Sequence, residues 1–194
     1  MHIRREQLIG LMGKTMDCFA RELLPEYEMD QAMEIIHACE RDENEYLSHV
    51  GATLYGDVRN VFERLRGMGY EIGIVSNCQA GYIEVFLETS GLGSYFEGHL
   101  CPGDTGNAKA DNICKIIQEY HLKAPVYVGD TLGDFNATKT AGIPFVFASY
   151  GFGHVPSPDY TIHCPATHQS HFSLLYLGSN IISNVEITPV KPGI

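Results

Sequence analysis

The spacing of apolar residues predicts helices at the start of the chain. Over residues 1 to about 50, apolar residues such as Leu8 and Phe19 recur at helical intervals. We expect two or three helices here, with breaks near Pro25 and around residues 42–44. This part contains no apolar run of the kind that forms a strand.

After residue 51 the pattern changes to short apolar runs that alternate with amphipathic helices. Continuous apolar runs are typical of parallel strands that are covered on both faces. The pattern therefore predicts an α/β protein with a doubly wound, mostly parallel sheet. The runs that we assign to strands are 72–75, 126–128, 143–150 and a short edge strand at 160–163.

Two carboxylates, Asp130 and Asp134, follow the strand predicted at 126–128. If a helix begins near Thr131, both carboxylates project from its first turn, at the edge of the sheet where ligands bind in this class. Close carboxylates are costly without a cation, and oxygen ligands with open positions suit Mg²⁺. The alternative is local: Asp130 ends the strand, and Asp134 caps or fills the first helical turn.

Polar residues also follow the strand predicted at 72–75. Ser76 and Asn77 open a small polar loop before the next helix, and the N–H groups of such a loop can bind an anion. Lys109 stands just ahead of another amphipathic helix. A single lysine at that position is usually a solvated surface charge.

Composition limits the classes of partner. The 194 residues are 44% hydrophobic, which is enough for one core and a small accessory domain. A net charge of −11 and a pI of about 5.2 argue against binding to nucleic acid or to an anionic membrane. No apolar run approaches the roughly 20 residues that cross a bilayer, and no signal peptide is recognisable. Scattered cysteines without a C-x-x-C pair are typical of a reducing cytosol, so we expect a cytoplasmic protein.

The order Ser76, Lys109, Asp130 and Asp134, with the flanking sequences SNC, AKADNI and VGDTLGDFNATKTAGIP, resembles the haloacid dehalogenase-like (HAD) hydrolase superfamily. The resemblance is to its phosphoglycolate-phosphatase-like branch with a helical cap, over about residues 51–150. It implies a Mg²⁺-dependent phosphatase that acts on a small phosphorylated metabolite through an aspartyl-phosphate intermediate.

The resemblance also assigns a role to each candidate residue. Ser76 and the backbone N–H of Asn77 would bind the phosphoryl group, and Lys109 would neutralise its charge. Asp130 would ligate Mg²⁺, and Asp134 would ligate or orient it. These roles fit a reaction that is catalysed mainly by positioning and charge neutralisation.

The family's nucleophile, the first aspartate of an Asp-x-Asp motif that ends the first strand, has no counterpart. The aspartates that could replace it do not follow an apolar strand run: Asp17, Asp30, Asp42 and Asp57. We therefore expect the chain alone to be inactive, because no aspartyl phosphate can form. The simplest interpretation is an N-terminally truncated phosphatase, through a late start codon, a frameshifted gene or a deliberately shortened clone.

The first strand is the central one in this fold, so its absence leaves a slot between the strands that end at Ser76 and Asp130. We expect either direct pairing of these strands or a slot filled by the C-terminal tail or by another chain, since unpaired buried backbone groups are expensive. The resemblance divides the chain into a helical cap at 1–52, an α/β core at 53–180 and a tail at 181–194.

Other functions remain open. The chain can be a non-catalytic protein that binds phosphate or metal through Ser76, Lys109 and Asp130. It can also be an interaction module whose slot accepts a strand from another copy or another protein. A dehalogenase is a weaker alternative, because that reaction needs no metal pair.

Overall fold

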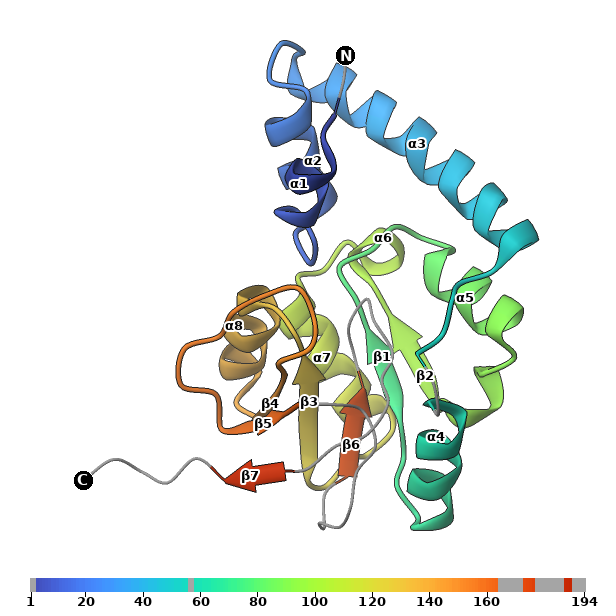
Figure 1. Cartoon of the computed structure of the whole chain (residues 1–194), viewed down its shortest axis with the longest axis vertical. Coiled ribbons are helices and arrows are strands. Elements are labelled where there is room, and N and C mark those ends of the chain that lie inside the picture. The colour runs from blue at the N-terminus through green and yellow to red at the C-terminus, as the bar shows by residue number, and fades with distance from the viewer. Residues whose placement is uncertain (1–2, 56–57, 164–172, 177–186, 190–194) are drawn as a thin grey trace.

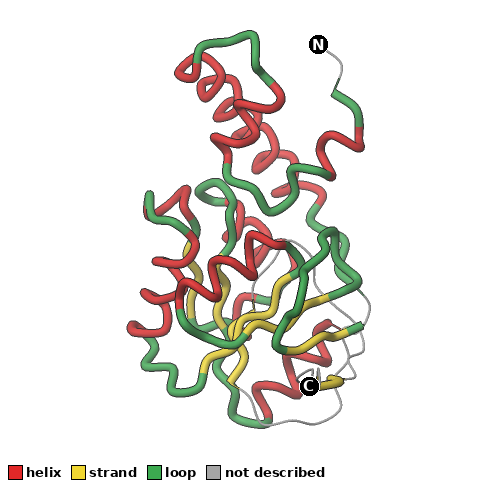
Figure 2. Tube along the Cα trace, turned by 90° about the vertical axis from the view of Figure 1, so that its left-hand side faces the viewer, coloured by secondary structure: helices red, strands yellow, loops and turns green. Residues whose placement is uncertain are grey.

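The structure is a computed structural model that describes residues 3–55, 58–163, 173–176 and 187–189. Its first helices are α1 (Arg5–Ile9), α2 (Met16–Leu23) and α3 (Met29–Val50). They form a group at one end of the molecule, beyond the strands, in both Figure 1 and Figure 2. The group has its own small core, built around the buried side chains of Ala20, Leu24, Ala32 and Ile36.

Two details of this helical group differ from the sequence-based expectation. The break predicted at 42–44 is wrong, because α3 runs without interruption to Val50. Its polar residues there lie largely on the solvent side, where charged residues are compatible with a helix. The periodic pattern across Leu8 and Phe19 spans two helices, since Gly13 between them has a φ of 80°, outside the helical region.

The rest of the described chain alternates strands and helices. In chain order the elements are α4 (Val58–Gly67), β1 (Gly73–Val75), α5 (Tyr82–Ser90), the 3₁₀ turn η1 (Gly93–Tyr95), β2 (Gly98–Leu100), α6 (Pro102–Thr105), α7 (Lys109–Glu119), β3 (Pro125–Gly129), α8 (Leu132–Ala141), β4 (Phe145–Ala148), β5 (Tyr160–Ile162), β6 (Ser173–Tyr176) and β7 (Ile187–Pro189). All four strands predicted from apolar runs are present. Strand β2 was missed because its sequence, GHL, is half-buried and has no apolar run.

The strands are mostly parallel, which confirms the predicted fold class. One ladder has the order β6-β3-β4-β5-β7, in which β7 alone is antiparallel, and β1 pairs with β2 in parallel. Strand β6 lies between β3 and β1 (Figure 1). Its backbone pairs with β3 from Pro125↔Ser173 to Val128↔Tyr176. A C-terminal segment of the same chain therefore occupies the central slot.

Side chains alternate along each strand, so each strand contributes to both faces of the sheet. Both faces are covered. On β3, Val126 and Val128 pack in a cluster with Phe62 of α4, whereas Tyr127 packs in a second cluster with Ile113 of α7. Helices thus lie on opposite faces, as in a doubly wound fold.

Some predictions fall outside the described residues, namely the region of Asp57 and all of the predicted tail, 181–194, except β7. The predicted boundary at 52 lies in the stretch between α3 and α4. None of the described helices is long and apolar enough to cross a membrane.

The position of β6 can be tested with proline. Alternate N–H groups of a strand point to opposite sides, so one of the two variants Leu174→Pro and Leu175→Pro removes a hydrogen bond to β3. We expect that variant to lose about 2 kcal/mol of stability, which lowers the melting temperature by roughly 4–8 °C for a chain of this size. Leu174→Ala and Leu175→Ala are the controls for loss of the side chain. Equal melting of each proline variant and its alanine control would show that β6 is not paired in the slot.

Candidate functional site

A buried ion pair joins two of the predicted site residues. Lys109 is the first residue of α7, and its Nζ lies 2.6 Å from Asp134 Oδ1 in the first turn of α8. The two side chains are only 6% and 2% exposed. Lys109 is therefore not a solvated surface charge, which was the alternative for a lysine at this position.

The second oxygen of Asp134 organises the start of α8. Asp134 Oδ2 accepts hydrogen bonds from the Thr131 hydroxyl at 2.8 Å and from the backbone N–H groups of Thr131 and Asp130 at 3.0 and 3.3 Å. Thr131 is the N-cap, and its hydroxyl accepts from the N–H of Asp134 in return, which completes a capping box. The alternative that Asp134 serves the first turn of α8 is thus correct for Oδ2, whereas Oδ1 pairs with Lys109.

The surroundings of Asp134 favour its charged form. Burial raises the pKa of Asp134, but the charge and hydrogen bond of Lys109, with the donors from Thr131, outweigh burial and hold the pKa below its ordinary value. A lowered pKa means that this carboxylate stabilises the fold at neutral pH. That contribution is lost as the pH falls through the lowered pKa.

Asp130 is in a different electrostatic situation, although it lies only four residues away. It precedes the N-cap of α8, is buried, and accepts a hydrogen bond at Oδ2 from the backbone N–H of Phe152 at 2.8 Å. Burial raises the pKa of Asp130, and the nearby charge of Asp134 adds to this, against the lowering effect of Phe152 and Lys109. Its ionised form is disfavoured where it stands, so a bound cation would stabilise it.

The loop that supplies Phe152 passes so close to Asp130 that it requires glycine. A Cβ at Gly151 would lie 2.3 Å from Asp130 Oδ2, and one at Gly153 would lie 2.5 Å from the Asp130 carbonyl oxygen. From its sequence this segment is predicted only to be a loop. The two glycines flanking Phe152, directly after an apolar strand, are the signal that could have indicated a close approach.

Ser76 and Asn77 follow β1, as predicted, and face the helical group. Asn77 donates a hydrogen bond from Nδ2 to the carbonyl of Gly13 at 2.9 Å. Its Oδ1 is buried and has no hydrogen-bond partner among the described residues. Both Ser76 and Asn77 line a cavity of about 390 Å³ between the helical group and the sheet.

The loop between α1 and α2 also contacts the second half of the site. A Cβ at Gly13 would lie 2.8 Å from the Cγ2 atom of Thr131. Gly13 therefore touches the loop that carries Asp130, and its carbonyl holds Asn77. These contacts bring the helical group directly over the predicted site residues.

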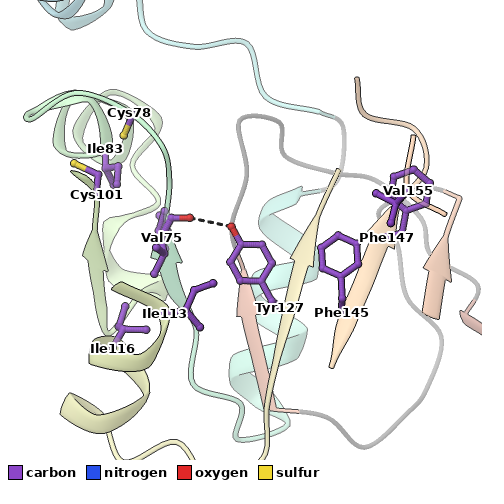
Figure 3. Packing of buried hydrophobic residues seen from close by; sticks show 11 residues of the cluster. Val75, Cys78, Ile83, Cys101, Ile113, Ile116, Tyr127, Phe145, Phe147 and Val155 are labelled. Carbon is purple, nitrogen blue, oxygen red and sulfur yellow. Dashed lines mark hydrogen bonds between the residues drawn. The ribbon is translucent and has the colours of Figure 1, made fainter. Parts of the chain in front are cut away.

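Tyr127 connects the parts of the site, although the sequence pattern indicates only that it belongs to a strand. Its hydroxyl oxygen lies 3.1 Å from the Val75 carbonyl oxygen and 3.2 Å from Asp134 Oδ1, so its proton can serve either acceptor. Figure 3 shows the ring reaching from β3 toward Val75 on β1. The Lys109 ammonium lies 5.9 Å from the centre of the same ring, at cation–π distance.

The described residues offer one carboxylate for a metal and a second to support it. No group of three or more His, Cys, Asp or Glu side chains that could hold a metal is found among them. Both oxygens of Asp134 accept hydrogen bonds from protein donors, which suits an orienting group. Asp130, with its unfavourable buried charge, fits the chemistry of a direct ligand for a hard cation such as Mg²⁺.

Comparison with known proteins places the chain in a family. The family model described as haloacid dehalogenase-like hydrolase matches residues 1–148. The phosphoglycolate phosphatase of Aliivibrio fischeri is 31% identical over 118 residues, which are 58% of this chain and 50% of that protein. The phosphoglycolate phosphatase of Escherichia coli K12 is 28% identical over 109 residues, or 54% of this chain and 43% of that protein. The chain thus spans about half the length of the curated relatives that it matches.

Solved structures show the same fold. A haloacid dehalogenase-like family hydrolase from Streptococcus pneumoniae aligns with a TM-score of 0.69 at 20% identity, covering 84% of this chain and 79% of that one. A predicted phosphatase from Clostridium acetobutylicum aligns with a TM-score of 0.68 at 17% identity, covering 79% of this chain and 72% of that one. At these identities the likeness supports the fold alone.

Tyr127→Phe tests whether the hydroxyl holds the site together. The change removes a buried hydrogen-bond partner of Val75 and Asp134 while keeping the ring, so we expect a loss of about 1–3 kcal/mol of unfolding free energy in urea titrations. Tyr46→Phe is the control, because Tyr46 is 66% exposed on α3. If both variants keep the parent's stability, the hydroxyl does not support the site.

Proposed function

The chain belongs to the haloacid dehalogenase-like hydrolases, and we propose that its site binds a small phosphate monoester together with Mg²⁺, as in a phosphatase. The observation that carries the proposal is the buried pair of Lys109 and Asp134 together with the buried Asp130, whose charged form is disfavoured. A buried cation whose position is fixed is the kind of group that neutralises phosphate. A buried carboxylate whose charge is unfavourable is the kind that gains from a divalent cation.

We assign a role to each residue on these grounds. Asp130 ligates the metal, and Asp134 fixes both the Lys109 ammonium and the loop that carries Asp130. Lys109 neutralises charge on the phosphoryl oxygens, and the Ser76 hydroxyl and the Asn77 N–H donate to them. Bound Mg²⁺ would supply further positive charge for the phosphate and the attacking group.

The proposed reaction needs a nucleophile that the described chain does not offer. In the family's mechanism an aspartate attacks phosphorus and water then releases the phosphate. Asp17 lies on α2, and Asp30 and Asp42 lie on α3, so none of them ends a strand. We therefore propose that this chain alone binds phosphate and Mg²⁺ without turnover, which is the non-catalytic alternative.

The alternative of strand exchange is less favoured. Strand β6 occupies the slot that would accept another chain, so self-association there requires β6 to leave. The partner that we propose is a small phosphorylated metabolite. The net charge of −11 argues against nucleic acid and anionic membranes.

Activity is tested with p-nitrophenyl phosphate and Mg²⁺. We expect the 194-residue chain to hydrolyse it no faster than the Asp130→Asn variant, because positioning groups cannot replace the attacking group. Release of p-nitrophenol, followed by its absorbance, is the measurement. Mg²⁺-dependent turnover that Asp130→Asn abolishes would show that an aspartate of this chain is the nucleophile.

Metal binding is tested by thermal unfolding with and without Mg²⁺. At a Mg²⁺ concentration about ten times the dissociation constant, we expect a gain of about 1.4 kcal/mol, or roughly 3–6 °C, from binding to the folded state alone. Asp130→Asn should remove this gain. Asp111→Asn, at an exposed position of α7, should retain it. An equal response of all three proteins would exclude Asp130 as a ligand.

A further inference from the structure

The cavity that Ser76 and Asn77 line extends into the helical group. Its volume of about 390 Å³ is in the range of small-molecule sites. Away from the loop after β1, its wall is mostly apolar and is built from α2, α3 and the segment before α2. The side chains that form this wall include Met12, Met16, Phe19, Leu23, Ile35 and Ile36.

The charges around the cavity do not favour a second anion. Lys14 is the only basic residue among the described residues that line it, whereas Glu40 and Glu43 also line it. Lys14 Nζ is 2.6 Å from Glu22 Oε1. That pair is exposed and therefore weak, so Lys14 can turn into the cavity. Its single positive charge would still face the two carboxylates of Glu40 and Glu43, so the lining would repel an incoming carboxylate.

Tyr82 adds a neutral polar group to the wall. Burial, with a smaller contribution from the charge of Glu43, raises the pKa of Tyr82 to about 12, so the hydroxyl stays protonated at neutral pH. The cavity thus combines a polar end at Ser76 and Asn77 with an apolar wall.

We propose that this cavity binds the alcohol portion of a phosphate monoester, and that it selects an apolar, uncharged alcohol over one with a second negative group. The inference rests on the proposed function, because Ser76 and Asn77 place the phosphate at the polar end. It predicts that 2-phosphoglycolate, the substrate for which the curated relatives are named, binds poorly in this cavity, because it carries a carboxylate next to the ester.

Two ligands of nearly equal shape give the direct test. Isobutyl phosphate has two methyl groups where 2-phosphoglycolate has two carboxylate oxygens. Titration calorimetry of the whole chain with Mg²⁺ should show isobutyl phosphate binding at least about tenfold more tightly, since each buried methyl or methylene group is worth roughly three- to fourfold. From methyl to n-hexyl phosphate, affinity should rise by a similar factor per methylene. A preference for 2-phosphoglycolate, or a flat series, overturns the inference.

Variants of the wall identify where the alcohol binds. Met12→Asp should weaken n-hexyl phosphate but not inorganic phosphate, Met12→Leu should keep the parent affinity, and Leu8→Asp, at an exposed position on α1, is the matched control. Lys14→Met, at a partly exposed position, should weaken 2-phosphoglycolate no more than it weakens inorganic phosphate. If Lys14→Met weakens 2-phosphoglycolate selectively, Lys14 serves a carboxylate and the inference is wrong.

Two simpler probes separate this inference from the proposed function. Inorganic phosphate reports the polar end alone, and n-hexanol reports the apolar wall alone. Hexanol binding without phosphate binding overturns the proposed function but supports the apolar cavity. Phosphate binding without any gain from the alkyl chain overturns the cavity inference only, and binding of neither probe overturns both.

Discussion

The ion pair between Lys109 and Asp134 is the interaction on which the site depends. Two opposite charges that are almost fully buried must stay together, because removing either one leaves an uncompensated charge at a cost of about 3–5 kcal/mol. Asp134 also completes the capping box of α8 with Thr131 and accepts a hydrogen bond from the backbone N–H of Asp130. One carboxylate therefore fixes the start of two helices and the position of the proposed metal ligand.

The same region shows how the fold accommodates its unusual central strand. Strand β6 pairs with β3 and lies beside β1, so a segment from late in the chain fills the middle of the sheet. Tyr127 adds a side-chain link from β3 to the Val75 carbonyl on β1 (Figure 3). Its hydroxyl is also within hydrogen-bond distance of Asp134, which ties the packing of the sheet to the charged site.

The sequence predicted the features that local patterns encode. Apolar runs indicated the strands, short motifs after two of them indicated Ser76 and Asp130, and the family resemblance indicated Lys109 at the start of a helix. Features that depend on distant residues were not predictable in this way. The contact of Gly13 with Thr131 and the hydrogen bond from Phe152 to Asp130 join segments that no periodicity connects. The two roles of Asp134 also became separable only from geometry, because a capping residue and a charge partner have the same sequence signature.

The late position of β6 in the chain has a consequence for biosynthesis. During translation, β1 and β3 leave the ribosome well before residues 173–176. Until β6 is synthesised, the edges of β1 and β3 that face it have no strand to pair with. Pairing across such a sequence separation is slow, because the entropy cost of closing a long loop comes before any stabilising contact forms. The nascent chain thus passes through a stage with exposed strand edges, in which binding by a chaperone would favour correct folding over association with other chains.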